Sequence, residues 1–526
     1  MQNPAIIFSL ISFLWLIVFT KKLFFWVWLW QLKEYHVGRF KAHFQTDKGK
    51  KIIVNDLLAT KITIFFLLFL NFFFIYFLFL VFLIETLFIL KSLIQRTFKI
   101  PVLTKKTYLI LSLGIFLEFS TIFFYLKIPS IIFYIFLLAL DILAPLFFSG
   151  LILAFEPLAV HWRKKIIEKA TKKREEFKNL IVIGITGSYG KTSTKEFLGQ
   201  ILSEKFKVLK TKEHQNSEVG ISQCVLNELK PEHQIFICEM GAYDREGIKL
   251  LTEIVKPKIG ILTGINEQHL ATFGSLENII KTKYELIESL PKDGLAVFNG
   301  NNKYCVDLFE KTNISKRLTN KDIWTENIQV EKEFISFRVF IKEEAEYFKL
   351  NLLGKHWIEN VLMAVLVAKE MGISLKEIST ACQKIKPFSR GMKSIRTKEG
   401  LNLIDATYSA NFNGVISHLD YLKIWQGKKV IVMPCLIELG NMAEDIHQKI
   451  GEKIGEVCDL AIITTKEFFK DIKVGAEKKR MNSEKILFLE KPIEIFEKIK
   501  NFTEKEDVIL LESRVPKGLL NLLNIK

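Results

Sequence analysis

The stretch that decides the fold is GITGSYGKTSTKEFLGQIL, which runs from Gly184 to Leu202. It continues the apolar run LIVIGI (180–185) and leads into an amphipathic pattern, so the order is strand, glycine turn, helix. Glycines in such a turn let backbone N–H groups approach a phosphate, and the start of the following helix adds positive potential. The stretch therefore predicts a nucleotide-binding loop rather than a chance glycine turn.

Side chains of this loop have distinct expected roles. Lys191 is expected to meet the β- and γ-phosphates of a nucleotide, and the Thr192 hydroxyl is expected to ligate Mg²⁺. The other expected ATP-binding residues of the loop are Thr186, Gly187, Ser188, Gly190 and Ser193.

Alternating strand and helix patterns continue after the loop. Apolar runs at 234–240, 258–264 and 294–300 predict a parallel α/β sheet with ligand loops at the C-terminal ends of its strands. A second block begins near residue 400, with LNLIDAT, KKVIVMP, LAIITT and DVILLES as its expected strands, and a mixed region at about 300–390 joins the two. The expected domains are a transmembrane region (1–160), a basic juxtamembrane linker (161–179), a central ATP-binding domain (180–390) and a C-terminal domain (391–526).

The first 160 residues are mostly apolar and rich in Phe. Ile62–Ile84 has 23 residues without a charge, which is enough for a membrane-spanning helix, and Thr107–Leu126 and Ile131–Phe155 are further candidates. Ala5–Thr20 is short for a span, and the Trp-rich LFFWVWLW (23–30) that follows is typical of a membrane interface. We expect about four hydrophobic segments and a multi-pass protein of the cell membrane.

The basic segments indicate the orientation only in part. The stretch 161–178 is strongly basic and leads into the ATP loop, so the soluble domains are expected in the cytoplasm. Residues 91–106 are also basic, which places both ends of the last helical hairpin inside. If Ile62–Leu90 crosses once, the basic 31–61 loop lies outside. Either that loop breaks the positive-inside rule or an early segment is re-entrant.

Net charge and cysteine spacing argue against several classes of function. The net charge of +17 does not indicate nucleic-acid binding, because basic residues cluster at the ends of apolar segments. The six cysteines have no paired spacing, which favours buried thiols in a reducing compartment over disulfides or a metal site. Glu85, Glu118 and Asp141 lie in or near apolar spans; an interfacial position or a partner on a neighbouring helix explains them better than transport.

Five motifs of the soluble part resemble the Mur ligases in order and spacing. They are TGSYGKTS, NSEVG (216–220), EMGA (239–242), HLATFGS (269–275) and KTKYEL (281–286). Within the family, the chain is most similar to the branch that adds D-alanyl-D-alanine, over roughly residues 180–526. The resemblance implies a P-loop central domain and a Rossmann-like C-terminal domain, with ATP and Mg²⁺ as cofactors. It implies amide formation through an acyl-phosphate, joining D-alanyl-D-alanine or a related amine to a muramoyl-peptide-like peptidoglycan precursor.

Three residues after the loop complete the expected catalytic set with Lys191. Glu239 ends an apolar strand, where a carboxylate can hold Mg²⁺, although alone such a residue is more often a cap or an ion-pair partner. By resemblance, His269 is a ligand of a second metal, and Lys283 is the lysine that this family carbamylates, which would then face the metals. Without the resemblance, His269 would be a structural residue and Lys283 part of a solvated helix face.

Further residues acquire nucleotide-side roles from the resemblance alone. GKHWIENVLMA (354–364) resembles the adenine-side helix of the family and retains His356 and Asn360, but it has Trp357 where an Asn is usual. Arg390 lies one position away from a family arginine, and Gly264 replaces a usual Asn at a strand end. Asn360 and Arg390 are expected to contact ATP.

The C-terminal domain departs most from the family pattern. LIDATYSANFNGV (403–415) retains Asp405, expected to bind ATP, but has Ala406 where a second Asp is usual. Cys435 likewise replaces an Asp, and Leu511-Glu512 stands where Lys-Gly usually precedes the retained Ser-Arg. The resemblance implies that the substrate contacts are Asn216, Ser217, Asn411, Ser513 and Arg514.

The membrane segment stands where this branch of the family carries a domain that grips the UDP end of its substrate. One hypothesis is a lipid-linked acceptor held in the membrane; the alternative is anchorage only, with a small soluble precursor as substrate. A separate alternative to the enzyme is a catalytically degenerate ATP-binding scaffold or regulator of cell-wall synthesis. Intact Lys191, Thr192, Glu239, His269 and Lys283 favour the enzyme. An ATP-driven transporter lacks a signature of its own.

Overall fold

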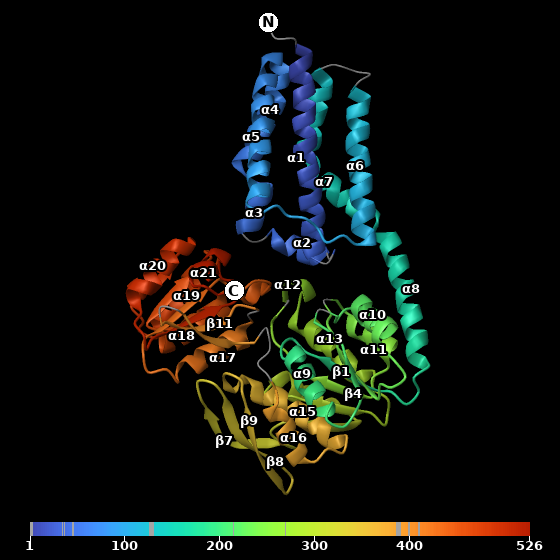
Figure 1. The fold of residues 1–526 in the computed structure, drawn as a ribbon, viewed down its shortest axis with the longest axis vertical. Helices are drawn as coiled ribbons and strands as arrows, with labels where there is room; N and C mark the ends of the chain where they lie inside the picture. Colours follow the sequence, from blue (N-terminus) through green and yellow to red (C-terminus); the bar gives the residue numbers. More distant parts are fainter. Residues whose placement is uncertain are drawn as a thin grey trace. The chain divides into compact units, whose positions relative to one another are not determined.

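The computed structural model describes residues 4–33, 35, 37–44, 47–125, 131–213, 215–242, 244–268, 270–385, 391–397, 400–408 and 411–525. They form two compact units, Met1–Lys164 and Lys165–Lys526 (Figure 1). The six cysteines are free and buried, as expected from their scattered spacing.

The first unit is helical, and five of its helices are long and apolar enough to cross a membrane. The candidate spans are Ile7–Leu32 in α1 (Pro4–Leu32), Gly49–Leu70 over α3 and α4 (Asp56–Leu70), Phe72–Ile94 with α5 (Ile75–Ile94), Lys105–Phe123 in α6 (Lys105–Tyr125), and Ile132–Glu175 over α7 (Ile131–Ala154) and α8. The short helices α2 (Val37–His43) and α3 (Asp47–Ile53) lie between α1 and α4, and α8 (Glu156–Glu175) leads into the second unit. Helix α1 packs against α5, α6 and α7.

The expectation that the N-terminal segment is short for a span is wrong. Residues from Pro4 to Leu32 form one continuous helix. The indole N–H of Trp15 donates to the carbonyl of Leu137 at 2.9 Å, and that of Trp30 donates to Ser149 Oγ at 2.9 Å. Because α7 supplies these acceptors, the tryptophans can lie inside the bundle instead of at a wet interface.

The expected single crossing at Ile62–Leu90 is also wrong, because the chain turns at Asn71. This residue has an extended backbone (φ −152°, ψ 131°), and its Oδ1 accepts from Phe73 N at 2.8 Å. The turn continues through a 3₁₀ turn at Phe72–Phe74 into α5. An uninterrupted apolar composition cannot show such a break, so four expected segments become five helices.

The fifth helix removes the conflict over the basic segments. The end of α1, the start of α4, the end of α5 and the start of α6 lie at one end of the helical unit, together with α2 and α3 (Figure 1). The basic segments 31–61 and 91–106 are therefore at the same end, and neither alternative for the early topology is needed.

Four charged side chains meet inside the helical unit. Asp141 accepts ion pairs from Lys22 (2.7 Å) and Lys61 (2.5 Å), and Lys61 also pairs with Glu85 at 2.5 Å. The side chain of Asp141 is fully buried and that of Lys61 is 2% exposed. Separately, Thr20 Oγ1 donates to Glu118 at 2.6 Å. The three carboxylates noted in the sequence therefore have partners on neighbouring helices.

The second unit begins with a parallel sheet of order β2-β3-β1-β4-β5-β6. Its strands are β1 (Ile181–Thr186), β2 (Val208–Lys210), β3 (Ile235–Glu239), β4 (Ile259–Leu262), β5 (Leu295–Phe298) and β6 (Ser315–Leu318). Its helices are α9 (Lys191–Leu202), α10 (Glu218–Glu228), α11 (Gly247–Val255), α12 (Leu270–Phe273), α13 (Leu276–Glu288) and α14 (Lys303–Lys311). Separate apolar cores lie on the two faces of the sheet.

The mixed region at about 300–390 contains an antiparallel sheet that the sequence reading did not identify. Strands β7 (Trp324–Val330), β8 (Ile335–Ile341) and β9 (Glu344–Leu350) form it, and the turn η2 (Lys355–Trp357) follows. Helices α15 (Ile358–Glu370) and α16 (Leu375–Gln383) complete the region, and α15 packs against α9. The alternation Phe337-Arg338-Val339 is the strand signal that could have revealed β8.

A second sheet has the order β10-β11-β15-β12-β13-β14, with only β10 antiparallel to its neighbour. Its strands are β10 (Lys393–Arg396), β11 (Asn402–Ala406), β12 (Lys429–Met433), β13 (Leu460–Ile463), β14 (Ile486–Phe488) and β15 (Val508–Glu512). Its helices are α17 (Phe412–Leu422), α18 (Ala443–Val457), α19 (Phe469–Lys478), α20 (Pro492–Phe502) and α21 (Lys517–Leu522). The eight strands expected from apolar runs are all present.

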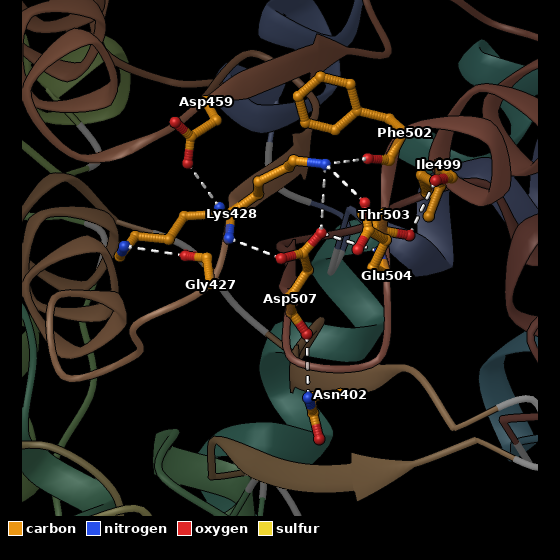
Figure 2. Close-up of polar contacts among 10 residues, drawn as sticks. Asn402, Gly427, Lys428, Asp459, Ile499, Phe502, Thr503, Glu504 and Asp507 are labelled. Carbon is orange, nitrogen blue, oxygen red and sulfur yellow. Dashed lines mark hydrogen bonds and ion pairs between the residues drawn. The ribbon is translucent and has the colours of Figure 1, made fainter.

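Polar side chains fix the starts of the strands in the second sheet (Figure 2). Asp507 accepts from Lys428 N at 2.7 Å and from Glu504 N at 2.8 Å. Asn402 donates to the carbonyl of Asp507 at 3.0 Å, and Asp459 accepts from Lys429 N at 2.8 Å. These bonds occupy the N-terminal edge of the sheet, so the opposite edge is the one where its strands open into loops.

We expect Asp141→Asn to lower the stability of the helical unit by about 3–5 kcal/mol, because Lys22 and Lys61 would lose their shared buried counter-ion. Thermal unfolding of the purified protein in detergent measures the change. Glu156→Gln is the control: Glu156 pairs with Lys106 at a partly exposed position, where the loss should be below about 1 kcal/mol. Equal shifts for the two variants would contradict the expectation.

Candidate active site

The candidate site forms where two neighbouring parallel strands end. In the register of β1 and β3, Ile185 is opposite Glu239, so the loop after β1 begins beside the Glu239 carboxylate. Strand β4 lies on the other side of β1 and ends at the same edge. The sequence predicted that ligand-binding loops follow the C-terminal ends of these strands, and the glycine loop and Glu239 lie there.

Backbone geometry makes the loop after β1 suited to a phosphate. Gly187 has φ 151° and Gly190 has φ 78°, both in the region that favours glycine. A Cβ at Gly187 would lie 2.9 Å from the carbonyl oxygen of Gly264, and Ser188 N donates to that same oxygen at 2.7 Å. The loop therefore lies too close to its neighbour for side chains at Gly187, which leaves backbone N–H groups to line it.

Lys191 begins α9 and folds back over the loop. Its Nζ donates to the carbonyl oxygens of Gly187 at 2.7 Å and Ser188 at 3.4 Å. Burial lowers the pKa of this amine, and the nearby Glu239 carboxylate offsets part of that effect. The cation is thus positioned over the place where the backbone can receive a phosphate.

Glu239 is held by partners on both carboxylate oxygens. Thr192 Oγ1 donates to Oε2 at 2.9 Å, and Asn216 Nδ2 donates to Oε1 at 3.2 Å. Burial alone would raise the pKa of Glu239, but Lys195, Lys191 and these hydrogen bonds hold it below its ordinary value. An ionised carboxylate beside a threonine hydroxyl at a phosphate loop is a donor set that suits a hard cation such as Mg²⁺.

Lys195 belongs to this arrangement, and the sequence reading missed it. Its side chain is fully buried, and Nζ lies 3.2 Å from Glu239 Oε2. It follows Lys191 by one helical turn, so both lysines lie on the same side of α9. The spacing was available in the sequence, but a lysine in an amphipathic helix is ordinarily a solvated residue.

Lys283, on α13, is buried rather than solvated. Its side chain is largely enclosed, with Nζ donating to the carbonyl of Ala242 at 3.3 Å and lying 5.5 Å from the ring centroid of Phe273. Burial, assisted by the charge of Lys191, lowers the pKa of the Lys283 amine to about 7. A substantial fraction of this amine is therefore uncharged at neutral pH.

Asn360 reaches the loop from α15. Thr194 Oγ1 donates to its Oδ1 at 3.3 Å, and a Cβ at Gly190 would approach the same oxygen. Trp357, which replaces the family Asn, is instead a core residue: its indole N–H donates to Leu353 O at 2.9 Å and its ring packs edge-on to Phe197.

Gly264 has a structural explanation in Tyr189 of the loop. A Cβ at Gly264 would collide with the Tyr189 ring, and Gly264 has φ 153°. Asn302 Nδ2 donates to the Tyr189 hydroxyl at 3.3 Å, which fixes the ring. Loss of the usual side chain at the strand end therefore leaves room for a tyrosine that packs beneath the loop.

The C-terminal candidates lie at the loop-bearing edge of the second sheet. Asp405 is the penultimate residue of β11. Its carboxylate accepts from Thr407 N at 3.0 Å and from the Thr407 hydroxyl at 2.6 Å. Asn411 caps α17 by accepting from Gly414 N at 3.1 Å. Ser513 has φ 60° and donates from N to the carbonyl of Ala406, and Arg514 is exposed.

One hydrogen bond joins the segment after β4 to the start of α17. Asn266, in the segment after β4, donates through Nδ2 to Asn413 Oδ1 at 2.8 Å. Neither residue was among the sequence predictions. Among the described residues, no hydrogen bond or ion pair links Asp405, Asn411, Ser513 or Arg514 directly to Lys191, Thr192 or Glu239.

Glu512, which replaces a usual glycine, has a partner. Its side chain is fully buried, and its Oε2 lies 2.6 Å from His418 Nδ1 on α17. The His418 ring packs edge-on to that of His356, whose pKa burial and His418 push well below its ordinary value. The departure from the family pattern is therefore compensated by a neighbouring imidazole.

Some predicted residues carry less structural information. His269 and Arg390 lie outside the described residues. Ser217 caps α10 by accepting from Gly220 N at 3.3 Å, and Ser193 lies in the first turn of α9. In the described part of the chain, no three His, Cys, Asp or Glu side chains cluster as a metal site, so Thr192 and Glu239 are the donors that the geometry brings together there.

Comparison with known proteins agrees with this geometry. Residues 185–368 match the Mur ligase middle domain. The chain is 29% identical over 306 residues to the UDP-N-acetylmuramoyl-tripeptide–D-alanyl-D-alanine ligase of Buchnera aphidicola, covering 57% of this chain and 66% of that ligase. It is 26% identical over 336 residues to the ligase of the same name from Bacillus subtilis, covering 63% and 72%. The chain thus spans about two-thirds of the length of these relatives.

A solved structure of the same type superimposes on the second unit's fold. MurF from Acinetobacter baumannii matches with a TM-score of 0.63 and 25% identity, covering 69% of this chain and 79% of that one. MurF ligase from Thermotoga maritima, solved in complex with ADP, shares the fold with a TM-score of 0.59 and 23% identity, covering 69% and 84%. With the phosphate loop, Glu239 and Asn216 in the arrangement described, the second unit contains a Mur ligase middle domain and is similar to MurF ligases in sequence and fold.

Proposed function

We propose that this protein is an ATP-dependent ligase that forms an amide bond on a peptidoglycan precursor, with D-alanyl-D-alanine or a related amine as second substrate. The observation that carries the proposal is the contact set around Glu239: Thr192 and Asn216 bind its carboxylate, and Lys191 lies over the adjoining loop. The named relatives support the substrate class, because each is named as a ligase of D-alanyl-D-alanine and a UDP-N-acetylmuramoyl-tripeptide.

The reaction brings two anions together, which explains the charges of the site. A carboxylate oxygen of the acceptor attacks the γ-phosphorus of ATP, giving an acyl-phosphate and ADP; the amine then attacks the acyl carbon, phosphate leaves, and the nitrogen loses a proton. Lys191 reduces the repulsion in the first step by its charge. Thr192 and Glu239 would hold Mg²⁺, which when bound polarises the phosphate oxygens.

Lys283 is suited to carbamylation, in which its uncharged amine adds CO₂ to give a carbamate and a proton. Burial supplies the uncharged amine, because it lowers the pKa of Lys283 to about 7. The product is a carboxylate-like group close to Ala242, three residues beyond Glu239. We propose this group and His269 as further metal-site residues.

The carbamate makes activity depend on CO₂ and on pH. Because the reactive form is the neutral amine, the CO₂-dependent activity should rise as pH increases through about 7 and fall below it. Lys283→Arg, which stays charged, should lower kcat/KM by about 10–100-fold. Rates in CO₂-depleted and bicarbonate-supplemented buffer, with ¹³C NMR of protein in ¹³C-bicarbonate, measure both effects. Full activity of Lys283→Arg would contradict the carbamate.

Residues from several parts of the second unit would supply the remaining contacts. Asp405, Asn360 and Arg390 are proposed on the nucleotide side, with the loop residues Thr186, Ser188 and Ser193. Asn411, Ser513 and Arg514 follow the C-terminal ends of strands β11 and β15 in the second sheet, and we propose that they contact the amine substrate there. Asn216 and Ser217, at the start of α10, are proposed on the acceptor side.

We further propose that the five helices cross the cell membrane with their basic end in the cytoplasm. The segments 31–61 and 91–106 and the basic stretch in α8 then follow the positive-inside rule together. Five crossings place the N-terminus outside and the ligase unit inside, where ATP is available. A precursor held in the membrane would be presented to an enzyme anchored in this way.

Cysteine labelling tests the orientation. With a membrane-impermeant thiol reagent on intact cells, Phe73→Cys, in the turn between α4 and α5, should be labelled. Lys50→Cys, at the basic end in α3, should be labelled only after permeabilisation. The parent protein, whose six cysteines are buried, provides the background. The reverse pattern would refute the orientation.

Turnover by the purified protein tests the ligase. Phosphate release from ATP with Mg²⁺ should require both D-alanyl-D-alanine and a muramoyl-tripeptide acceptor, offered in UDP-linked and lipid-linked forms. Lys191→Ala should lower kcat/KM by at least about a hundredfold, because it removes the cation over the loop. Lys258→Ala, which removes an exposed ion pair with Asp293, is the matched control and should retain activity.

Each outcome separates the alternatives. Preference for the lipid-linked form supports a membrane-held acceptor, and equal rates on both forms support anchorage alone. ATP binding without turnover on any acceptor would replace the ligase by an ATP-binding scaffold.

A further inference from the structure

One side of α1 carries a ladder of two half-buried aromatic rings and two exposed lysines. Lys21, Phe25 and Trp28 follow the spacing i, i+4, i+7 and so share a face of the helix. Lys21 Nζ lies 5.7 Å from the Phe25 ring centroid, and the Phe25 and Trp28 centroids are 5.8 Å apart. Lys99, from the segment after α5, places its Nζ 5.3 Å from the Trp28 ring centroid.

The segment that carries Lys99 is tied to α1 on both sides of this lysine. Gln31 Nε2 donates to the carbonyl of Val102 at 2.9 Å, and Val102 N donates back to Gln31 Oε1 at 2.7 Å. Phe98 packs against Phe24 with ring centroids 6.3 Å apart. Lys99 is therefore held beside Trp28 by its neighbours and is not placed by the cation–π contact alone.

Neither lysine of the ladder forms an ion pair in the described part of the helical unit. Inside the bundle, Lys22 and Lys61 are matched by Glu85 and Asp141. Lys21 and Lys99 are exposed, and within the described part of the chain neither has a carboxylate within 4 Å. A lysine in a spanning helix without a counter-ion is costly, so an anion from outside the chain would stabilise this face.

The position of the ladder suits the head group of a lipid. Lys21 lies eleven residues before the end of α1, which corresponds to about 17 Å along the helix, and its Nζ is directed over Phe25 towards that end. Lys99 lies near the same end, beside Trp28. The ladder thus extends from Lys99 and Trp28, near the end of α1, to Lys21 about 10 Å deeper along the helix, and a lysine can extend its amine from within a span towards the head groups.

We propose that the ladder of Lys21, Phe25, Trp28 and Lys99 binds the diphosphate of a lipid-linked form of the acceptor; this rests on the proposed ligase acting on a membrane-held precursor. Charge selects this occupant: two lysines without ion pairs match a diphosphate, which carries at least two negative charges as a monoester or a diester, whereas a phospholipid phosphodiester carries one. The rings of Phe25 and Trp28 offer an apolar contact to the adjoining lipid chain.

Binding of farnesyl diphosphate to the full-length protein in phosphatidylcholine nanodiscs tests the site without ATP or amine. All variants carry Lys191→Ala, so that the phosphate loop does not contribute to the signal. Lys21→Leu and Lys99→Leu should each weaken binding by about tenfold, and Lys21→Arg and Lys99→Arg should retain it. Lys91→Leu, an exposed lysine at the basic end of α5, is the control and should leave binding unchanged.

Competitors identify the source of the phosphate. Farnesyl diphosphate should bind more tightly than either phosphatidylglycerol or inorganic pyrophosphate. Equal competition by either, or binding unaffected by both leucine variants, would overturn the proposal. Thermal unfolding in nanodiscs confirms that each variant is folded. This experiment measures no turnover, so absence of binding would contradict the lipid site and not the ligase function. Binding of the probe by a protein without ligase activity would contradict the proposed function and not the lipid site.

Discussion

The parallel pairing of β1 with β3 is the constraint on which the site depends. It places Ile185 opposite Glu239, so the glycine loop and the carboxylate emerge side by side from one edge of the sheet. From there, Thr192 in the first turn of α9 reaches Glu239 at 2.9 Å. A change of register by one residue would turn Glu239 to the other face of the sheet and separate the pair.

Both units balance buried charge locally, because an isolated charge away from water is costly. In the ligase unit, Glu239 is matched by Lys195 and by the nearby Lys191. In the helical unit, Asp141 is matched by Lys22 and Lys61. Lys283 differs: burial and the charge of Lys191 lower the pKa of its amine, and Glu285 offsets only part of that shift.

Departures from the family pattern have structural partners. Tyr189 fills the space left at Gly264, Trp357 packs on Phe197, and Glu512 pairs with His418. A substitution that looks like drift when read singly is accommodated by a second residue distant in sequence. Such pairs are invisible in one sequence, since nothing in it states which residues meet. The Glu512–His418 pair is the one of these that lies in the C-terminal part, and it favours an adapted over a degraded C-terminal part.

The sequence by itself determined the phosphate loop, the eight apolar strands and the presence of long apolar helices, because these depend on local periodicity and glycine spacing. Tertiary structure alone decided that α4 and α5 are separate at Asn71, that β7–β9 form a sheet, and that Lys195 and Lys283 are buried. The physical reason is that burial and pairing depend on residues far apart in the chain. A lysine on an amphipathic helix has the same local pattern whether it meets water or a carboxylate.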